Sequence, residues 1–388
     1  MSTVCSIFSQ LLKLIPRAGF DAAVRKHQAE RNAKGFTCWG QLVAMLFCQL
    51  GSVNSLRDIT NGLAASEGKL RHLGLPAAPK RSTLAYANSH RPWQLFEEVF
   101  HQLLDVGCNL AQQSGVGYKF RFKNKLFSID ASTMELCASV FDWAHFRRTK
   151  SAVKLHLMLD HDGLLPSYAV ITDGKRHEVT VTRTWSFAPG TILVFDRGYT
   201  DYAWFEQLTR EGVFFVTRLK SNADYIVVED RPLPQRQGLL GDQIICMTQP
   251  AAPDRPTFLR RIEFHDAGQN RVLVFLTNNM KLAAATVAEI YKNRWQIELF
   301  FKALKQSCKV KTFVGTSANA LKTQIWTALI AMLQVKILHM KSTFGWHLSN
   351  FMVLLRQQLF VYRDLWKWID LPFQAPETAT PQMQLAFG

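Results

Sequence analysis

The first 115 residues have apolar positions at three- and four-residue spacing, which predicts a region of helices. The pattern is clearest in IFSQLLKLI (7–15), WGQLVAMLFCQL (39–50) and PWQLFEEVFHQLLDVGCNL (92–110). The connections between these helices carry basic side chains, at Lys80, Arg81 and Arg91. Compact helices with basic connections suit a DNA-binding module of the helix-turn-helix type, and a plain helical domain that never meets DNA fits the same pattern.

After this helical region the pattern changes to that of strands. Runs at 126–130, 154–160 and 167–172 predict three strands, and the second of them, KLHLMLD, alternates with period two. A polar stretch at 177–185 then predicts a helix. The continuous apolar run TILVFD at 191–196 is typical of a buried parallel strand. The predicted order is therefore strand, strand, strand, helix, strand.

Several strand-like runs follow between 212 and 280, separated by prolines and polar clusters, and they predict a β-rich insertion. The stretch 283–307 is rich in good helix formers and predicts one long helix. The chain from there to about residue 370 is predicted to be helical, and the tail from Pro372 is expected to be loose.

Charge changes the picture because it indicates a partner. The chain has 46 Lys and Arg against 30 Asp and Glu, and this net +16 indicates a polyanionic partner, either nucleic acid or an anionic membrane. The excess lies at the two ends: residues 1–120 have 13 basic and 7 acidic side chains, 299–388 have 10 and 3, and 121–298 have 23 and 20. We therefore expect the ends to hold the partner and the middle to carry the chemistry.

The seven cysteines are scattered and form no CxxC pair, which argues against a disulfide framework and against a structural zinc site. No signal-peptide pattern opens the chain. The most apolar helical stretch, 324–338, is short and contains Lys336, so we expect a buried core helix and not a membrane span. These observations predict a protein of the reducing cytoplasm, without a membrane partner.

Two aspartates stand at the ends of predicted strands that can be neighbours. Asp130 ends the first strand and Asp196 closes the fourth. If these strands are parallel and adjacent, about 4.8 Å apart, the two carboxylates can share a divalent metal. Mg²⁺ takes oxygen ligands, removes the repulsion between the carboxylates and keeps sites open for water and phosphate. Gly198 allows a close backbone approach just after Asp196.

The predicted long helix supplies a third acid. At about 100° per residue, five side chains fall in one polar stripe, namely Tyr291, Arg294, Glu298, Lys302 and Lys305. The opposite side is apolar and suited to burial, with Ile297, Phe300 and Leu304. Such a stripe would present one carboxylate to a metal and the basic side chains to phosphates. A solvated amphipathic helix with an Arg294–Glu298 pair gives the same pattern.

A second group of basic residues lies between the first two predicted strands. Four residues, Arg147, Arg148, Lys150 and Lys154, form a run that is either a grip on the DNA backbone or a solvated loop.

Taken together, these motifs resemble those of a large family of bacterial insertion-sequence transposases, often called family four. Tyr291-x2-Arg294-x3-Glu298-x6-Lys305, within YKNRWQIELFFKALKQ, matches the YREK signature of that family. Four further landmarks are similar to those of the family: SIDAST (128–133), FRRTKSAVKLHLMLDHDG (146–163), ITDGKRHEV (171–179) and FDRGYTD (195–201). The resemblance covers roughly residues 80–370.

The resemblance implies an α/β fold in which an RNase H-like catalytic core with a β-rich insertion is flanked by an N-terminal all-helical domain and a C-terminal helical region. The expected divisions are a helical DNA-binding domain (1–115), the first part of the catalytic core (116–211), the β-rich insertion (212–280), the final catalytic helix (281–315) and the C-terminal helical region (316–388).

The resemblance also implies the activity of a DDE transposase, a polynucleotidyl transferase. Asp130, Asp196 and Glu298 would hold two Mg²⁺ ions, or Mn²⁺ in their place, for phosphoryl transfer at the terminal inverted repeats. Tyr291, Arg294, Lys302 and Lys305 would contact the transposon end. The implied partners are double-stranded DNA, as transposon ends and as target, and a second copy of the chain in a homodimer on paired ends. The implied place is the bacterial cytoplasm, at the nucleoid.

One feature departs from the family pattern. Some relatives place a Trp in the β-rich insertion to stabilise a flipped nucleotide during hairpin formation, whereas 212–280 contains no Trp and its place falls near Leu273. The hairpin step therefore stays open. Two other functions also stay open: a nuclease that cuts without joining, and a non-catalytic DNA-binding regulator descended from a transposase, against which the intact triad argues.

Overall fold

The structure is a computed structural model that describes residues 5–31, 33–66, 68–113, 120, 122–136, 145–147, 150–234, 238–248, 256–307 and 313–374. The chain forms two compact units, and each is described by itself. The first unit combines Met1–Val106 with Ser307–Gly388, and the second is Gly107–Gln306. The protein is thus a mixed α/β chain in which the two ends belong to one unit.

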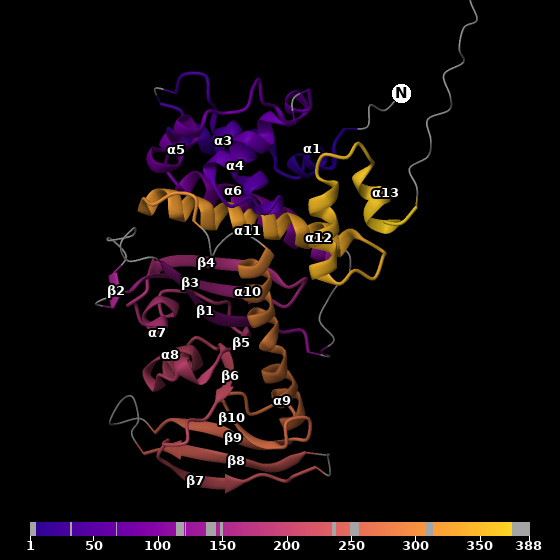
Figure 1. Ribbon diagram of the computed structural model, residues 1–388. Coiled ribbons are helices and arrows are strands. Elements are labelled where there is room, and N and C mark those ends of the chain that lie inside the picture. The colour runs from indigo at the N-terminus through magenta and orange to yellow at the C-terminus, as the bar shows by residue number, and fades with distance from the viewer. Residues whose placement is uncertain are drawn as a thin grey trace, which may run out of the picture. The chain divides into compact units, whose positions relative to one another are not determined.

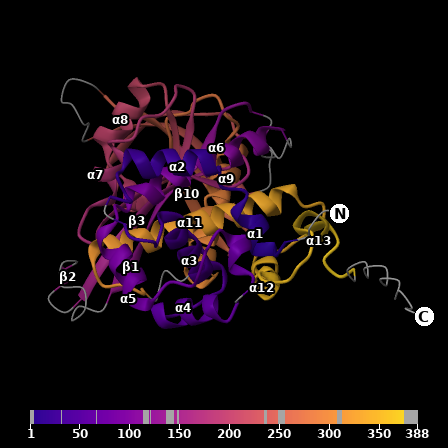
Figure 2. The ribbon, with the colours of Figure 1, turned by 90° about the horizontal axis from the view of Figure 1, so that it is seen from above.

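The first unit is helical, as the periodicity of the sequence predicts. Its helices are α1 (Ile7–Leu12), α2 (Arg17–Lys26), α3 (Cys38–Leu50), α4 (Leu56–Ala64), the 3₁₀ turn η1 (Leu70–Leu73), α5 (Arg81–His90), α11 (Ala318–Lys341), α12 (Leu348–Gln358) and α13 (Leu365–Asp370), while α6 (Gln94–Gln113) continues into the second unit. The core is built around α3 and α11, which pack against each other (Figure 2). Both helices are mostly apolar and buried around most of their circumference, as expected of helices at the centre of a unit.

The second unit is built on one ten-stranded sheet (Figure 1). Its strands are β1 (Leu126–Leu136), β2 (His145–Arg147), β3 (Lys150–Asp160), β4 (Leu165–Asp173), β5 (Ile192–Val194), β6 (Phe214–Arg218), β7 (Tyr225–Asp230), β8 (Leu239–Met247), β9 (Phe258–Asp266) and β10 (Arg271–Thr277). The order is β2-β3-β1-β5-β6-β10-β9-β8-β7, and β4 also pairs with β3. The pairs β1–β5 and β5–β6 are parallel, and the others are antiparallel.

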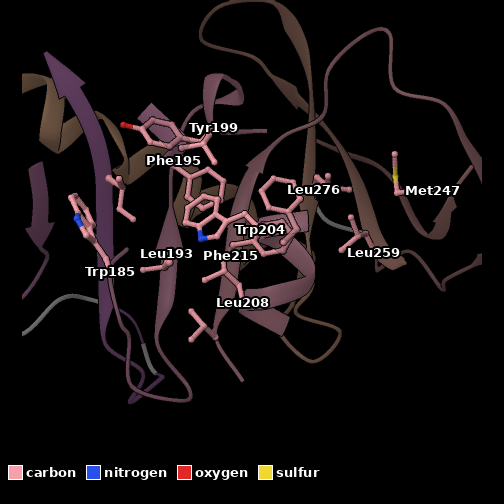
Figure 3. Packing of buried hydrophobic residues seen from close by; sticks show 14 of the residues in the cluster. Trp185, Leu193, Phe195, Tyr199, Trp204, Leu208, Phe215, Met247, Leu259 and Leu276 are labelled. Atoms are coloured by element: carbon pink, nitrogen blue, oxygen red, sulfur yellow. The ribbon is translucent and has the colours of Figure 1, made fainter. Parts of the chain in front are cut away.

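Both faces of the centre of this sheet are buried because β5 is apolar at every position. On one face, Leu193, Phe195 and Phe215 pack with residues of α7 (Glu178–Thr182) and α8 (Tyr202–Arg210), as Figure 3 shows in part. On the other face, Ile192 and Val194 pack with residues of α9 (Ala284–Asn293). This two-sided burial fits the continuous apolar run that predicted a parallel strand.

Several element boundaries differ from the sequence prediction. The run at 191–196 forms a strand only over β5, so Asp196 follows that strand and does not close it. The strand expected to end at Asp130 continues as β1 to Leu136, because its second half pairs with β3 in an antiparallel ladder that reaches Ser151. The prediction of one helix over 283–307 is wrong, since α9 ends at Asn293 and α10 (Trp295–Ser307) follows.

The break between these helices has a local cause. The backbone N–H of Arg294 donates to the carbonyl of Tyr291 at 3.1 Å, and that of Ile297 donates to the carbonyl of Arg294 at 3.1 Å, so both bonds span three residues instead of four. The Asn293 side chain donates to the carbonyl of Glu289 at 2.7 Å and so competes with the backbone at the same place.

None of the helices in the part of the chain that the structure describes is both long and apolar enough to cross a membrane.

Candidate active site

The two aspartates singled out from the sequence lie at the same edge of neighbouring strands. The parallel β1–β5 ladder pairs Ser128 with Val194, and Asp130 and Asp196 each follow two residues later in the chain. Adjacent strands are about 4.8 Å apart, so this register brings the two carboxylates near each other. Asp130 lies within β1, at the point where β1 has parted from β5, and not at the end of a strand.

Asp196 is fixed by the turn that follows β5. Its Oδ1 accepts a hydrogen bond from the backbone N–H of Gly198 at 2.8 Å, which caps the 3₁₀ turn η3 (Arg197–Tyr199). A Cβ atom on Gly198 would lie only 2.9 Å from that oxygen, so a larger residue there would displace the Asp196 carboxylate. The carbonyl of Asp196 accepts a hydrogen bond from the Thr217 hydroxyl at 3.1 Å, which ties the turn to β6.

Asp130 is partly buried, and burial makes the ionisation of its carboxyl costly. Burial raises the pKa of this carboxyl to about 7, and the nearby negative charges of Asp196 and Glu178 act in the same direction. The hydrogen bond from the backbone N–H of Ala131 to Oδ1, at 2.8 Å, and the charge of Arg294 oppose the rise in pKa. Asp130 therefore stands in a setting that favours a positive neighbour.

Glu298 and Arg294 form an ion pair on α10, between Arg294 Nη2 and Glu298 Oε1. The guanidinium also lies 5.5 Å from the centroid of the Tyr291 ring. The structure thus contains the Arg294–Glu298 pair that the sequence left as an alternative. Among the described residues, no group of three or more His, Cys, Asp or Glu side chains is arranged to hold a metal ion. Two of the three predicted acids come together, and the third is held by Arg294.

The two lysines of the predicted stripe have different environments. Lys305 Nζ donates to the carbonyl of Thr133 at 3.0 Å and so links α10 to β1. Lys302 is exposed. The apolar side of the helix is buried as predicted, through Ile297, Phe300 and Leu304.

The basic run between the first two predicted strands falls largely outside the description. Arg148 lies outside the described residues, and so do the side chains of Arg147 and Lys150. The backbone places Arg147 at the end of β2 and Lys150 at the start of β3.

Two residues near the aspartates were not singled out from the sequence. Glu178, the first residue of α7, is close enough for its charge to raise the pKa of both Asp130 and Tyr199, and it pairs with Lys154 Nζ at 3.2 Å. Both residues lie in quoted motifs, and Tyr199 follows Asp196 by one short turn. The closeness of Tyr199 to Asp196 in the sequence could therefore have indicated that Tyr199 belongs to the site.

The Tyr199 hydroxyl is the unusual group of the site. The residue is fully buried, its ring packs with Phe195 and Trp204, and its hydroxyl is without a hydrogen-bond partner among the described residues (Figure 3). Burial raises the pKa of this phenol well above its usual value, and the charges of Asp130, Glu178 and Asp196 add to the rise. A buried donor beside carboxylates can bond a ligand that those carboxylates hold.

The donor set fits a divalent cation. Asp130 and Asp196 each use Oδ1 to accept a backbone N–H, which leaves the second oxygen of each carboxylate for a ligand. A cation there would offset both the burial of Asp130 and its repulsion by Asp196, and hard divalent cations prefer oxygen ligands.

Comparison with known proteins adds two family matches. Residues 121–334 match the model of the transposase DDE domain, and residues 3–76 match that of a domain of unknown function (DUF4372). The chain is 30% identical over 294 residues to the putative transposase y4zB of Sinorhizobium fredii, covering 75% of this chain and 80% of that protein. It is 27% identical over 268 residues to the probable transposase for insertion sequence element IS5377 of Geobacillus stearothermophilus, covering 66% and 67%.

Among solved structures, the piggyBac transposase synaptic complex with hairpin DNA covers 91% of this chain and 78% of its own, at 10% identity and a TM-score of 0.43. A score this low supports no argument about this chain.

Proposed function

The chain belongs to the transposase DDE domain family and is therefore an enzyme that acts on DNA; from this premise we propose that it cuts an insertion sequence at its terminal inverted repeats and joins the freed strands to target DNA. The observation that carries the proposal is the pair Asp130 and Asp196, at one edge of adjacent parallel strands and each with a free carboxylate oxygen. We also propose that the core is RNase H-like and that the YREK motif assigns the chain to family four.

The catalytic acids in this proposal are Asp130, Asp196 and Glu298. The two aspartates would hold Mg²⁺ or Mn²⁺, and Glu298 would complete the set for two ions. When bound, such ions supply the charge that activates the attacking oxygen and stabilises the leaving oxygen of the phosphodiester. The protein contributes the fixed turn at Gly198, which orients Asp196, and the hydrogen bond of Ala131, which orients Asp130.

Arg294 has a second role in this scheme. It holds Glu298 through Nη2, and its charge is also felt at Asp130. A phosphate of the transposon end is a competing partner for the guanidinium, since Arg binds phosphate and carboxylate by the same geometry. Contact of Arg294 with a phosphate would therefore release Glu298 toward the aspartates, while Tyr291, Lys302 and Lys305 contact the same DNA end.

Cleavage of a labelled duplex that carries the element's own end tests the proposal. Wild type with Mg²⁺ is expected to nick the duplex at the end, and EDTA, Asp196→Ala or Glu298→Gln is expected to abolish the nick while binding survives. Glu289→Gln is the matched control, because Glu289 is an exposed acid on the neighbouring helix α9.

The products separate the three functions that the sequence left open. Strand joining supports the transposase, and hairpinned ends show the hairpin step without a Trp in 212–280. Cutting that ignores the end sequence and never joins strands would make the protein a nuclease. Tight end binding with no cutting by wild type would make it a regulator. Assembly of two chains on paired ends, measured by the mass of the complex, tests the proposed homodimer.

A further inference from the structure

The segment that leads into and through α5 contains basic side chains and no acidic ones. Between residues 68 and 96 the sequence has five Lys or Arg residues, two His and no Asp or Glu. A run with five basic and no acidic side chains favours a polyanionic partner. The segment belongs to the first unit, away from the acids of the candidate active site in sequence.

The basic side chains of this segment divide into two groups. Arg91 donates to the carbonyls of Phe36 and Thr37, and Lys69 donates to the carbonyl of Phe360, so these two stabilise the unit. Arg71, Lys80 and Arg81 are exposed, and within the described residues their side chains make no hydrogen bond or ion pair. They are therefore available to an outside partner.

The inner side of α5 is held rigidly. Leu84 and Ala87 are buried, and the Asn88 side chain accepts a hydrogen bond from Gln41 at 2.9 Å. The carbonyl of Asn88 accepts another from the side chain of Asn319 on α11, at 2.8 Å. A helix anchored on one side in this way presents its other side in a fixed orientation.

The outer side of α5 consists of exposed polar and aromatic side chains: Arg81, Ser82, Tyr86, Ser89 and His90. Tyr86 is 66% exposed, and its ring stacks on that of His90 with centroids 3.9 Å apart. These residue types make the hydrogen bonds and apolar contacts by which proteins bind base edges, Arg to guanine above all.

We propose that α5 lies in the major groove of duplex DNA, with Arg81 and Ser82 at base edges and Lys80 at the phosphate backbone. The inference rests on the proposed function for the identity of the polyanion, and the charge of 68–96 is complementary to that partner. A helix of ten residues is about 15 Å long and about 10–12 Å wide, which the major groove, about 12 Å wide, accommodates.

If α5 is the second, DNA-reading helix, the connection that precedes it is longer than the turn of a helix-turn-helix. The connection between α4 and α5 spans residues 65–80 and contains η1, whereas the motif joins its two helices by a turn of about three or four residues. The exposed residues of α5, and not that motif, support its docking in the groove.

Binding by the full-length chain tests the inference. Asp196→Ala is the background, so that DNA is bound and not cut. The probes are 40-bp duplexes that tile the DNA on either side of the coding sequence, with one duplex of scrambled sequence. The variants are Arg81→Ala and Tyr86→Ala, and the matched control is Arg25→Ala, which removes the same charge from an exposed position of α2.

Arg81→Ala is expected to weaken binding of the preferred duplex by about ten-fold or more, and to weaken binding of the scrambled duplex no more than Arg25→Ala does. Protection of guanine N7, which faces the major groove, from dimethyl sulfate is expected to disappear at one step of the preferred duplex. Because both side chains are exposed, we expect the variants to unfold at the same temperature as the Asp196→Ala background. An unchanged melting temperature would show that they are folded.

Three results would overturn the inference. Equal losses on both duplexes would make α5 a contact to phosphate only, and losses no larger than that of Arg25→Ala would show that α5 does not bind DNA. If wild type cuts the element's end and Arg81→Ala, made without the Asp196→Ala background, binds and cuts it normally, the inference fails and the proposed function stands. If the Asp196→Ala protein prefers no duplex over the scrambled one, both fail.

Discussion

At the residue scale, the proposed metal-binding role of Asp130 conflicts with the stability of the folded chain. Burial raises the pKa of its carboxyl to about 7 from the usual 3.8. The unfolded chain ionises at the lower pKa, so the folded state is penalised increasingly from about pH 4 to 7 and fully above pH 7. Asp130→Asn is therefore expected to raise the free energy of unfolding at pH 8, by up to roughly 4 kcal/mol, and much less at pH 5. Urea unfolding in EDTA measures the difference, and a gain independent of pH would contradict it.

Binding of a metal ion at the same carboxylate is expected to raise the stability of the folded chain, so it can be measured by thermal unfolding. A cation that binds only the folded state raises its stability, by about 2.7 kcal/mol at one hundred times its dissociation constant. We expect Mg²⁺ to raise the melting temperature of wild type and to have little effect on Asp130→Asn or Asp196→Ala. The control is Glu289→Gln, which keeps both aspartates and should respond to Mg²⁺ as wild type does.

Most substitutions in the core lower the free energy of unfolding, whereas Tyr199→Phe is expected not to lower it. Its hydroxyl is buried without a partner among the described residues, so Tyr199→Phe removes an uncompensated polar group and leaves the ring packing. The free energy of unfolding of the metal-free protein is expected to stay unchanged or rise by about 1 kcal/mol. A loss of more than about 1 kcal/mol in urea unfolding would show that the hydroxyl is bonded in solution.

At this scale the sequence predicts the residues that a local pattern positions, and it misses those that depend on packing. Strand order and the position of Asp130 and Asp196 placed two carboxylates together, and the β1–β5 register does bring them to one edge. Helical spacing placed Glu298 on the same side as Arg294. It could not decide whether the carboxylate binds a metal or the guanidinium, because spacing along a helix gives no distance to the aspartates on the sheet. Glu178 and Tyr199 were missed because burial and charge coupling depend on packing that no local pattern contains.

At the scale of elements, the strands β8 and β9 are joined by a buried ion pair. Arg260 of β9 and Asp242 of β8 share two hydrogen bonds, of 2.8 and 2.6 Å, with side chains only 3% and 5% exposed. Asp242→Ala leaves a buried charge unpaired and is expected to lower the free energy of unfolding by about 3–5 kcal/mol. Asp266→Ala is the control, because its pair with Arg271 is largely solvated at 3.8 Å and contributes little. Similar losses from both substitutions would contradict this account.

The elements themselves were predicted where one local pattern dominated. The strands of 212–280 and the helix after β4 follow from period and turn residues, and the structure contains them. The extension of β1 was missed because it depends on pairing with β3, which lies later in the chain. The break at Arg294 was missed because good helix formers flank it, and the competing bond of Asn293 is a side-chain choice.

At the scale of the whole molecule, the first unit combines segments from the two ends of the chain. Helical periodicity showed that α3 and α11 are apolar, but it could not show that each is the partner that buries the other. The excess positive charge of both ends therefore falls largely in one unit, while the acids of the candidate site lie in the other.

This separation of charge makes salt the simplest test of how the chain holds DNA. Neutralising phosphates releases condensed counterions, so the logarithm of the binding constant falls linearly with the logarithm of salt concentration. For the scrambled duplex, we expect a loss of about a hundred-fold or more between 50 and 200 mM salt, which corresponds to about four or more phosphate contacts. Asp196→Ala should keep the slope of this salt dependence. Arg81→Ala should make the slope shallower on the preferred duplex, and on that duplex only, if the Arg81 side chain reaches a phosphate as well as a base. A flat response would remove the electrostatic basis of DNA binding, because the net +16 would then have another partner.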